Sequence, residues 1–576
     1  MTPEAPRPVP ARRGFSLHYR NTQLLSKIDP LHQAERIVAS LDSRPQNLYF
    51  CPSPLLGYGL EQLLARTHSS SAILCVESDP QLHKLSREAL LPLLDANPSR
   101  IALAPPDITT PEEILAFLES IWPPRRFRRV ISLKTNRGWS LDSARYTALE
   151  ETVRTHIYQA WQNTITLLRL GQRYTSNLIR NLPLISVVPA LSSTAVGTRD
   201  ILALGAGPGL DALLDQLQAE HPAFGDPTKR HFSIFCVDTA LRPLLERGIR
   251  PDAVLALEAQ YWNLLDFIGT GTLPLILDLA SHYATWRVCT KDTPPLTAAP
   301  QALVSTQWAP LQLFTRLEGA GLLPSKIPPL GSVGLSLVQL ALTLTRGRVI
   351  IAGLDFAFSA DSFHAKGTSH GLMHESSTNR LTSLFRAERA FRQGVHHHPD
   401  KNGFPILSDP ALEGYRNLFK SHFAHENRIL DAGEKGLDLG IPRVSGHEAG
   451  AILFEEKNFY TDSFLCAQES GRPVRPKAAW DTIHSFILTE QRALEDLRDI
   501  LTGQRALKQD ELVAHIDALD YLWAHFAEYQ GTRSSAELAS DQSFLKRLRA
   551  GIDRNLKDWM IAARSLEALK PVANGE

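Results

Sequence analysis

The segment Gly205-Ala206-Gly207-Pro208-Gly209 is the strongest candidate for ligand binding. Glycines let backbone N–H groups come close to a bound anion, and the positive end of a following helix stabilises that anion. The segment lacks the third glycine of a dinucleotide fingerprint, and no Gly-Lys-Ser/Thr follows it as in a P-loop. We expect Gly205, Gly207 and Gly209 either to cradle a nucleotide phosphate or to form a purely structural turn.

Four carboxylates follow short apolar runs: Asp238, Glu258, Asp278 and Asp355. Each one alone is typical of a helix cap or a surface group. Together they could hold a ribose, a metal ion or a nucleophile. Mg²⁺ is the metal that such oxygen ligands suit, but the sequence assigns no defined metal site.

Histidines downstream of Asp355 are the candidate proton acceptors. His364 follows Asp355 by nine residues and is our preferred general base, because histidine titrates near neutral pH. His370 and His374 are the alternatives for that role. For the triplet 396–398, between Gly394 and Pro399, we expect a solvated loop.

Elements that must position these residues lie between about 196 and 445. Apolar runs at 201–204, 234–237, 253–257, 273–277 and 349–352 alternate with helical segments. This alternation predicts a mostly parallel, doubly wound sheet, which binds ligands at the carboxyl ends of its strands. Ser332 precedes an apolar helix over 335–344, either as its N-cap or as a ligand contact.

The flanking zones have different patterns. Apolar runs at 47–51, 72–76 and 129–133 predict a small βαβ unit, and a long helix should begin near 149. Apolar steps of three and four over 512–526 and 545–559 predict antiparallel helices.

The whole chain is therefore expected to be α/β in three domains. Residues 1–195 should form a smaller amino-terminal Rossmann-like domain with a connecting helix. Residues 196–445 should form the central Rossmann-like doubly wound sheet, and residues 446–576 a helical carboxyl-terminal domain.

Composition excludes several classes of protein. The 576 residues contain 61 Lys+Arg and 61 Asp+Glu, so the basic excess typical of nucleic-acid binding is missing. The five cysteines form no CxxC pair, which argues against a zinc cage or a disulfide framework and suits a reducing compartment. Neither a secretory h-region nor an apolar run of about 20 residues is present. We expect a cytoplasmic protein with no membrane span.

In order, several segments resemble the motility-associated factor (Maf) family of flagellin glycosyltransferases. They are LGAGPGLD (204–211), VDTALRPLLERGIRPDAVLALE (237–258), GSVGLSLVQLALTLTRGRVIIAGLDFAF (331–358), HAKGT (364–368) and DAGEKGLDLGIP (431–442). The family has a central domain similar to bacterial sialyltransferases that use CMP-sugars. A related domain occurs in archaeal 6-hydroxymethylpterin diphosphokinase.

The resemblance implies transfer of a nonulosonic, sialic-acid-like sugar from a CMP-sugar donor to Ser or Thr of flagellin. Gly205, Gly207 and Gly209 would contact the phosphate, while Asp238, Glu258 and Ser332 would fix the nucleoside. Asp355 and His364 would form the acceptor side, with one acting as base. The partners would be the nucleotide-sugar donor and flagellin, and no nucleic acid. No cofactor is assigned apart from the CMP-sugar, which is the donor substrate, with Mg²⁺ as an optional addition.

Two other functions remain. An ATP-dependent pterin-type diphosphokinase would use the strand-end carboxylates for Mg²⁺. A catalytically degenerate homologue would bind flagellin or a sugar nucleotide without turnover. The chain departs from the family pattern at Gly209, where Ser is common, at Glu258, where Asp is usual, and at Ala357–Phe358, where sialyltransferases place a tyrosine.

Overall fold

The computed structural model describes residues 5–108, 110–188, 191, 197–271, 273–288, 302–359, 362–381, 394–455, 477–506, 508–529 and 533–570. The chain folds into two compact units. One contains residues 1–171 and 524–541, and the other contains residues 172–523 and 542–576. Among the described residues, no helix combines the length and the apolar character that a membrane crossing requires.

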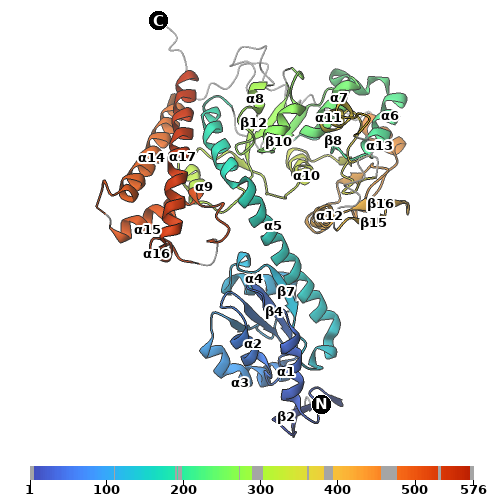
Figure 1. Ribbon diagram of the computed structural model, residues 1–576. Coiled ribbons are helices and arrows are strands. Elements are labelled where there is room, and N and C mark those ends of the chain that lie inside the picture. The colour runs from blue at the N-terminus through green and yellow to red at the C-terminus, as the bar shows by residue number, and fades with distance from the viewer. Residues whose placement is uncertain are drawn as a thin grey trace. The chain divides into compact units, whose positions relative to one another are not determined.

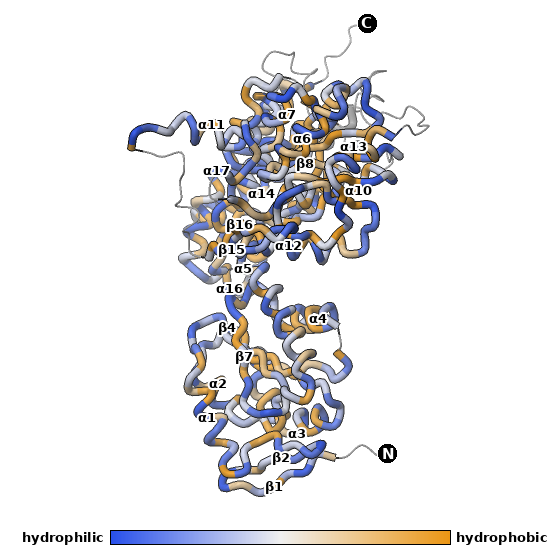
Figure 2. The backbone as a smooth tube through the Cα atoms, turned by 90° about the vertical axis from the view of Figure 1, so that its right-hand side faces the viewer, coloured by the Kyte–Doolittle hydropathy of each residue, from blue (hydrophilic) through white to orange (hydrophobic). Residues whose placement is uncertain are grey.

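A four-stranded parallel sheet forms the centre of the first unit. Its order is β6 (Ile101–Leu103), β5 (Ala72–Val76), β4 (Asn47–Pro52), β7 (Arg129–Ser132). Side chains alternate between two buried clusters: Leu48 and Phe50 join one, whereas Tyr49 and Cys51 join the other. Both faces of the sheet are covered, which is why these strands are continuous apolar runs, and Figure 2 shows hydrophobic colour along β4 and β7. The three predicted strands of this zone are confirmed.

Helices and one small sheet complete the first unit. The helices are α1 (Pro30–Ser40), α2 (Leu60–Arg66), α3 (Pro80–Ala96), α4 (Pro111–Ile121) and α16 (Ser535–Leu538). The small antiparallel sheet contains β1 (Arg7–Pro10), β2 (Phe15–Tyr19) and β3 (Thr22–Gln23). The predicted long helix is α5 (Ser143–Asn181), which carries the chain into the second unit.

An eight-stranded sheet, parallel throughout, forms the centre of the second unit (Figure 1). Its order is β13 (Ser325–Lys326), β12 (Ala302–Ser305), β11 (Leu275–Asp278), β10 (Ala253–Ala256), β9 (Ser233–Val237), β8 (Ile201–Leu204), β14 (Val349–Ala352), β17 (Ile429–Asp431). The chain runs from β8 outward to β13 and then returns to place β14 on the other side of β8. The loops that follow β8 and β14 therefore diverge, and such a switch point is where open α/β sheets bind ligands. The predicted doubly wound sheet is confirmed.

Helices connect these strands. They are α6 (Leu210–Glu220), α7 (Leu241–Glu246), α8 (Thr285–Val288), α9 (Gln312–Gly319), α10 (Val333–Leu344), α11 (Ser369–Ser376) and α12 (Pro410–Phe423), and α13 (Gly446–Phe454) follows the last strand, β17. The apolar helix α10 packs against β8, β9, β10 and β14, which explains why it is hydrophobic on nearly every side.

Carboxyl-terminal helices pack within the second unit. These are α14 (Lys477–Thr502), α15 (Gln509–Ala518) and α17 (Gln542–Ala568). Helices α14 and α17 lie side by side, and Asp558 of α17 pairs with Arg180 of α5 at 2.7 Å. The predicted helical character of this region is confirmed.

One predicted helix, over 512–526, is shorter than its apolar pattern. Helix α15 ends at Ala518, and a 3₁₀ turn follows over Asp520–Leu522. The carboxylate of Asp520 accepts the backbone N–H of Gln312, the first residue of α9, at 2.8 Å. A tertiary contact that caps another helix thus accompanies the break in this one.

Cys51, Cys75 and Cys236 are buried and free, which agrees with the expectation of no disulfide among them. Cys289 and Cys466 lie outside the described residues.

Candidate active site

A cavity of about 310 Å³ opens at the switch point of the large sheet. It is lined by the loop after β8, the loop after β14, the start of α10 and the loop after β9. Six predicted site residues line it together: Gly205, Gly207, Asp238, Ser332, Asp355 and His364. Residues separated by more than 150 positions in sequence thus share one ligand-sized space.

The glycine loop packs directly on the turn that follows β14. Gly205 donates its N–H to the carbonyl of Ala352, and Gly207 donates to that of Gly353, both at 2.8 Å. A Cβ atom on Gly205 would lie 2.3 Å from the carbonyl oxygen of Gly353, and one on Gly207 would lie 2.6 Å from the Asp355 carboxylate. Neither glycine has a positive φ, so the close approach of two backbones explains their presence. The phosphate cradle stays a prediction, in which a ligand would meet the part of this loop that lines the cavity, since the N–H groups of Gly205 and Gly207 are already used within the protein.

Gly209 does not line the cavity in the way Gly205 and Gly207 do. Its N–H donates to Oδ2 of Asp355 at 2.6 Å, and it is the N-cap residue of α6. Gly209 therefore connects the glycine loop to Asp355.

Ser332 is the N-cap residue of α10, but its side chain makes no capping hydrogen bond. Ser332, Val333 and Gly334 line the cavity, so the first turn of α10 presents its backbone there. A helix N-terminus of this kind stabilises a bound anion. The two interpretations of Ser332 are compatible, because the residue occupies the cap position while its hydroxyl is not used as the cap.

Asp355 is buried, with 3% of its surface exposed. Burial raises the pKa of its carboxyl to about 7, although the Gly209 N–H and the nearby charge of Lys401 oppose the shift. The next residue, Phe356, has a positive φ of 47°, which is rare for an aromatic residue and is typical of tightly constrained sites.

Lys401 and Asp431 form a buried ion pair close to Asp355. The exposed fractions of their side chains are 2% and 4%, and both charges act on the pKa of Asp355. The segment after β17 also contacts Asp355 directly, because Leu437 donates its N–H to the Asp355 carbonyl at 2.8 Å. Sequence analysis missed Lys401, and its position in a polar Asp-Lys-Asn-Gly turn gives no signal of burial.

Asp238 lies at the end of β9 and is also 3% exposed. Its carboxylate accepts hydrogen bonds from the backbone N–H of Thr239 and the side-chain amide of Asn263, both at 2.8 Å. Burial raises the pKa of Asp238 to about 7, and the neighbouring charge of Asp266 adds to the shift. Asn263 and Asp266 belong to a 3₁₀ turn, Tyr261–Asp266, that the sequence did not single out.

A second cavity of about 490 Å³ adjoins the first, and His364 and Thr239 line both. Glu258 lies in this second space with Asp266 and His370, not beside the glycine loop. Trp262 lines it too and is 65% exposed, so an aromatic side chain stands at its rim. The structure therefore separates Glu258 from the other residues that were expected to fix a nucleoside.

His364 is held at the junction of the two cavities by its own loop. Ala365 donates its N–H to the Ala206 carbonyl at 2.9 Å, and the N–H of Lys366 donates to Asp211 at 3.0 Å. These bonds attach the loop to the glycine turn and to α6. The imidazole is exposed, which keeps it accessible to a substrate proton.

The structure also places two other groups that the sequence pattern indicated. Asp278, the fourth strand-end carboxylate, is buried and accepts two hydrogen bonds from Thr306, at 3.1 and 2.8 Å, and burial raises its pKa to about 6. The loop predicted for 396–398 is wrong, because these residues belong to β15 (His396–Pro399), which pairs antiparallel with β16 (Pro405–Ser408). Their expected exposure to solvent is found: His396 and His397 are exposed and His398 is partly exposed. Hairpin pairing with the next strand stabilises extended backbone that the polar triplet alone does not indicate.

Comparison with known proteins agrees with this architecture. Residues 176–361 match the family described as 6-hydroxymethylpterin diphosphokinase MptE-like. The fold is similar to that of the Maf glycosyltransferase from Magnetospirillum magneticum AMB-1, with a TM-score of 0.51 and 15% identity, covering 99% of this chain and 91% of that one. The chain is thus Maf-like in fold, with an MptE-like central domain, as the resemblance implied.

A relative of nearly equal length is an uncharacterised protein from Treponema pallidum (strain Nichols). The two are 30% identical over 574 residues, which cover 96% of this chain and 94% of the relative. This chain belongs to the same family as the Treponema pallidum protein.

Proposed function

We propose that this protein is a glycosyltransferase that moves a nonulosonic acid from a CMP-sugar to Ser or Thr hydroxyls of flagellin. The observation that carries the proposal is the pair of adjoining cavities at the switch point, which share His364. One cavity would hold the donor and the other the acceptor, so the reacting atoms would meet beside that histidine.

The first cavity has features that suit a nucleotide donor. The start of α10 and the glycine loop supply a positive helix end and a surface without side chains, where a phosphate could approach. Ser332 offers a hydroxyl at the same place. Asp238, a buried carboxylate already oriented by Asn263, could accept hydrogen bonds from a ribose or from a base amine.

The second cavity suits an acceptor that is part of a protein. Trp262 and Met373 line this cavity and are 65% and 41% exposed, and Tyr261, the chain neighbour of Trp262, is 62% exposed. Exposed aromatic residues at a cavity rim are typical of protein recognition. Flagellin as the protein is taken from the Maf resemblance.

The proposed transfer needs a base and a stabilised leaving group. The acceptor hydroxyl oxygen would form a bond with the anomeric carbon while the bond from that carbon to the phosphate oxygen breaks. The hydroxyl proton would pass to the imidazole of His364, and CMP would leave with its phosphate at the start of α10. Asp355, which the sequence pattern placed on the acceptor side with His364, would in this proposal brace the glycine loop through Gly209 and hold the donor side in position.

A second candidate is transfer of diphosphate from ATP to a pterin-type alcohol. The match of residues 176–361 to the MptE-like family favours it. Asp238 and Asp266 lie close enough to influence each other electrostatically and could hold Mg²⁺. The reaction would then need a triphosphate in the first cavity in place of a CMP-sugar.

Calorimetric titration of the purified protein distinguishes these functions. We expect CMP to bind and ATP·Mg²⁺ to give no heat. Binding of ATP·Mg²⁺ without a response to CMP would favour the diphosphokinase. The mass of flagellin from cells with and without the protein tests transfer: CMP binding with no change in flagellin mass would favour a binding homologue without turnover.

The proposal places the protein in the cytoplasm. Cys51 and Cys75 are register partners on neighbouring strands and are both free thiols, a state that a reducing compartment maintains.

A further inference from the structure

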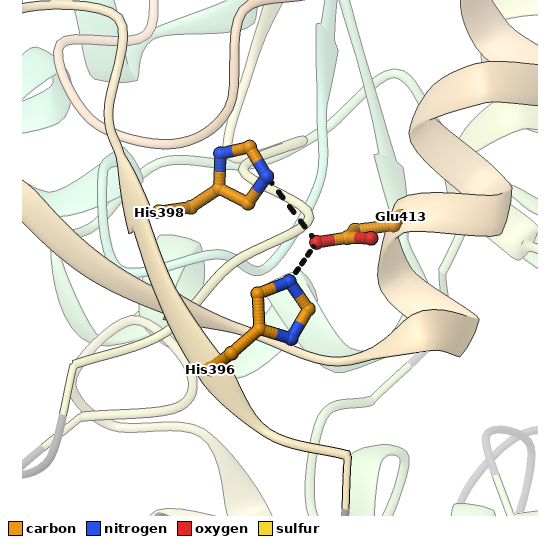
Figure 3. A group of neighbouring side chains, drawn as sticks. All are labelled: His396, His398 and Glu413. Carbon is orange, nitrogen blue, oxygen red and sulfur yellow. Dashed lines mark ion pairs between the residues drawn. The ribbon is translucent and has the colours of Figure 1, made fainter.

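Two of the three consecutive histidines lie on one face of β15. Side chains alternate along a strand, so His396 and His398 share a face and His397 points to the other. Figure 3 shows the imidazoles of His396 and His398 directed at the carboxylate of Glu413, which belongs to the first turn of α12. This group lies outside the two cavities described above.

The three ligand-type atoms converge tightly. Nε2 of His396 is 2.6 Å and Nε2 of His398 is 3.4 Å from Oε1 of Glu413. One ligand atom from each residue lies within 4.8 Å of the other two. Tetrahedral zinc with bonds of about 2.0–2.2 Å places neighbouring ligand atoms about 3.4 Å apart. Small side-chain movements would therefore bring all three atoms to bonding distance from one ion.

Charge near the group also favours a cation. The carboxylate of Asp409, the N-cap residue of α12, acts electrostatically on His396. Two neutral imidazoles and the Glu413 carboxylate would surround the ion with one formal negative charge, and the Asp409 carboxylate places a second negative charge nearby.

The group connects two elements that support the wall of the first cavity. Phe358 and Leu407 exchange backbone hydrogen bonds of 2.9 Å, and Ser408 donates its hydroxyl to the Phe356 carbonyl at 3.0 Å. Strand β16 is thereby attached to the loop after β14. Helix α12 supplies Leu412, the neighbour of Glu413, to the lining of the same cavity. An ion held between β15 and α12 would fix these two elements to each other.

We propose that His396, His398 and Glu413 bind a Zn²⁺ ion that clamps the β15–β16 hairpin to α12. Two imidazoles and one carboxylate are a ligand set that suits Zn²⁺ and other late first-row ions, whereas Mg²⁺ and Ca²⁺ prefer oxygen ligands. Three protein ligands leave the fourth tetrahedral position to water. The site is accessible, because the side chains of His396 and His398 are 47% and 34% exposed.

The test is titration of the full-length protein, free of affinity-tag histidines and treated with chelator, with Zn²⁺ in a calorimeter. We expect one equivalent to bind at this site, with no competition from millimolar Mg²⁺. Loss of an outer-shell partner alone costs about 10–100-fold in metal affinity, so His396→Ala and Glu413→Gln should each weaken this binding by at least about 100-fold. Both side chains are partly exposed, and far-UV circular dichroism would verify that the variants fold.

His397→Ala is the matched control, because it removes a histidine from the same strand but from the opposite face. It should bind Zn²⁺ as the parent does. Co²⁺ in place of Zn²⁺ should give the intense visible absorption of a tetrahedral site in the parent and in His397→Ala, but not in Glu413→Gln. Absence of stoichiometric binding in the parent, or equal losses in His397→Ala and His396→Ala, would refute the site and leave Glu413 as an ordinary ion-pair partner.

Discussion

Gly209 donates its backbone N–H to the carboxylate of Asp355 at 2.6 Å, across the switch point of the large sheet. The bond joins the loop after β8 to the loop after β14, the two loops that line the candidate donor cavity. Hydrogen bonds to an ionised acceptor are about twice as strong as neutral ones. The protonation state of Asp355 therefore controls how firmly the glycine loop is held.

Stability should depend on pH through Asp355. Its pKa of about 7 in the folded protein is above the ordinary value of 3.8, so the folded state keeps a proton that the unfolded state releases. The contribution of this proton to the free energy of unfolding is fully present below about pH 4 and is lost as the pH rises to about 7. Asp355→Asn should flatten the decline by up to about 1.4 kcal/mol per pH unit, measured as the free energy of urea unfolding between pH 4 and 8.

Asp438→Asn is a suitable comparison for that experiment. Lys420 pairs with Asp438 at 2.7 Å and holds the pKa of that carboxyl below its ordinary value. Replacing the Asp438 carboxyl should leave the decline of the unfolding free energy between pH 4 and 7 unchanged. An unchanged slope in Asp355→Asn would contradict the raised pKa.

Gly207→Ala should disturb the cavity. The added Cβ would lie 2.6 Å from the Asp355 carboxylate and 2.9 Å from the Gly353 carbonyl, so the two loops must separate. Overpacking of this kind costs about 1–3 kcal/mol. We expect that loss in urea unfolding and a fall in CMP affinity by titration. Gly319→Ala in α9, whose Cβ meets nothing within 4 Å, should change neither quantity for the worse.

His364→Ala should abolish most transfer while CMP binding is kept. A positioned base contributes about 10²–10⁴-fold to the rate, and His364 lines both cavities. Transfer rates of His364→Ala, His370→Ala and His374→Ala should be compared on purified flagellin. Full activity in His364→Ala, with a loss in either of the other variants, would transfer the role to that histidine.

The buried pair of Lys401 and Asp431 gives a fourth test. Lys401→Met would leave the Asp431 carboxylate buried without its cation, beside Asp355, and breaking such a pair costs about 3–5 kcal/mol. Adding Asp431→Asn removes the stranded charge and should recover a large part of that loss. Equal destabilisation by the single and double changes, measured by urea unfolding, would show that the charge is not the cause.

The sequence alone determined where most strands of the two parallel sheets lie along the chain. Apolar runs such as 72–76 and 201–204 coincide with β5 and β8, because strands buried on both faces consist of apolar residues only. The alternation of strands with helices, together with the glycine turn after β8, also predicted that the candidate site residues lie at one edge of one sheet. Six of them line the same cavity.

Only the tertiary structure decided which contacts each of those residues makes. The N–H groups of Gly205, Gly207 and Gly209 are used between loops, and Glu258 faces the second cavity, because strand order and loop paths set these contacts. Burial of Lys401 depends on a segment 30 residues away, and polar sequence gives no signal of it. His396, His398 and Glu413 are close in sequence, but they meet because the β15–β16 hairpin folds beside α12, and a polar histidine triplet gives no signal of that hairpin.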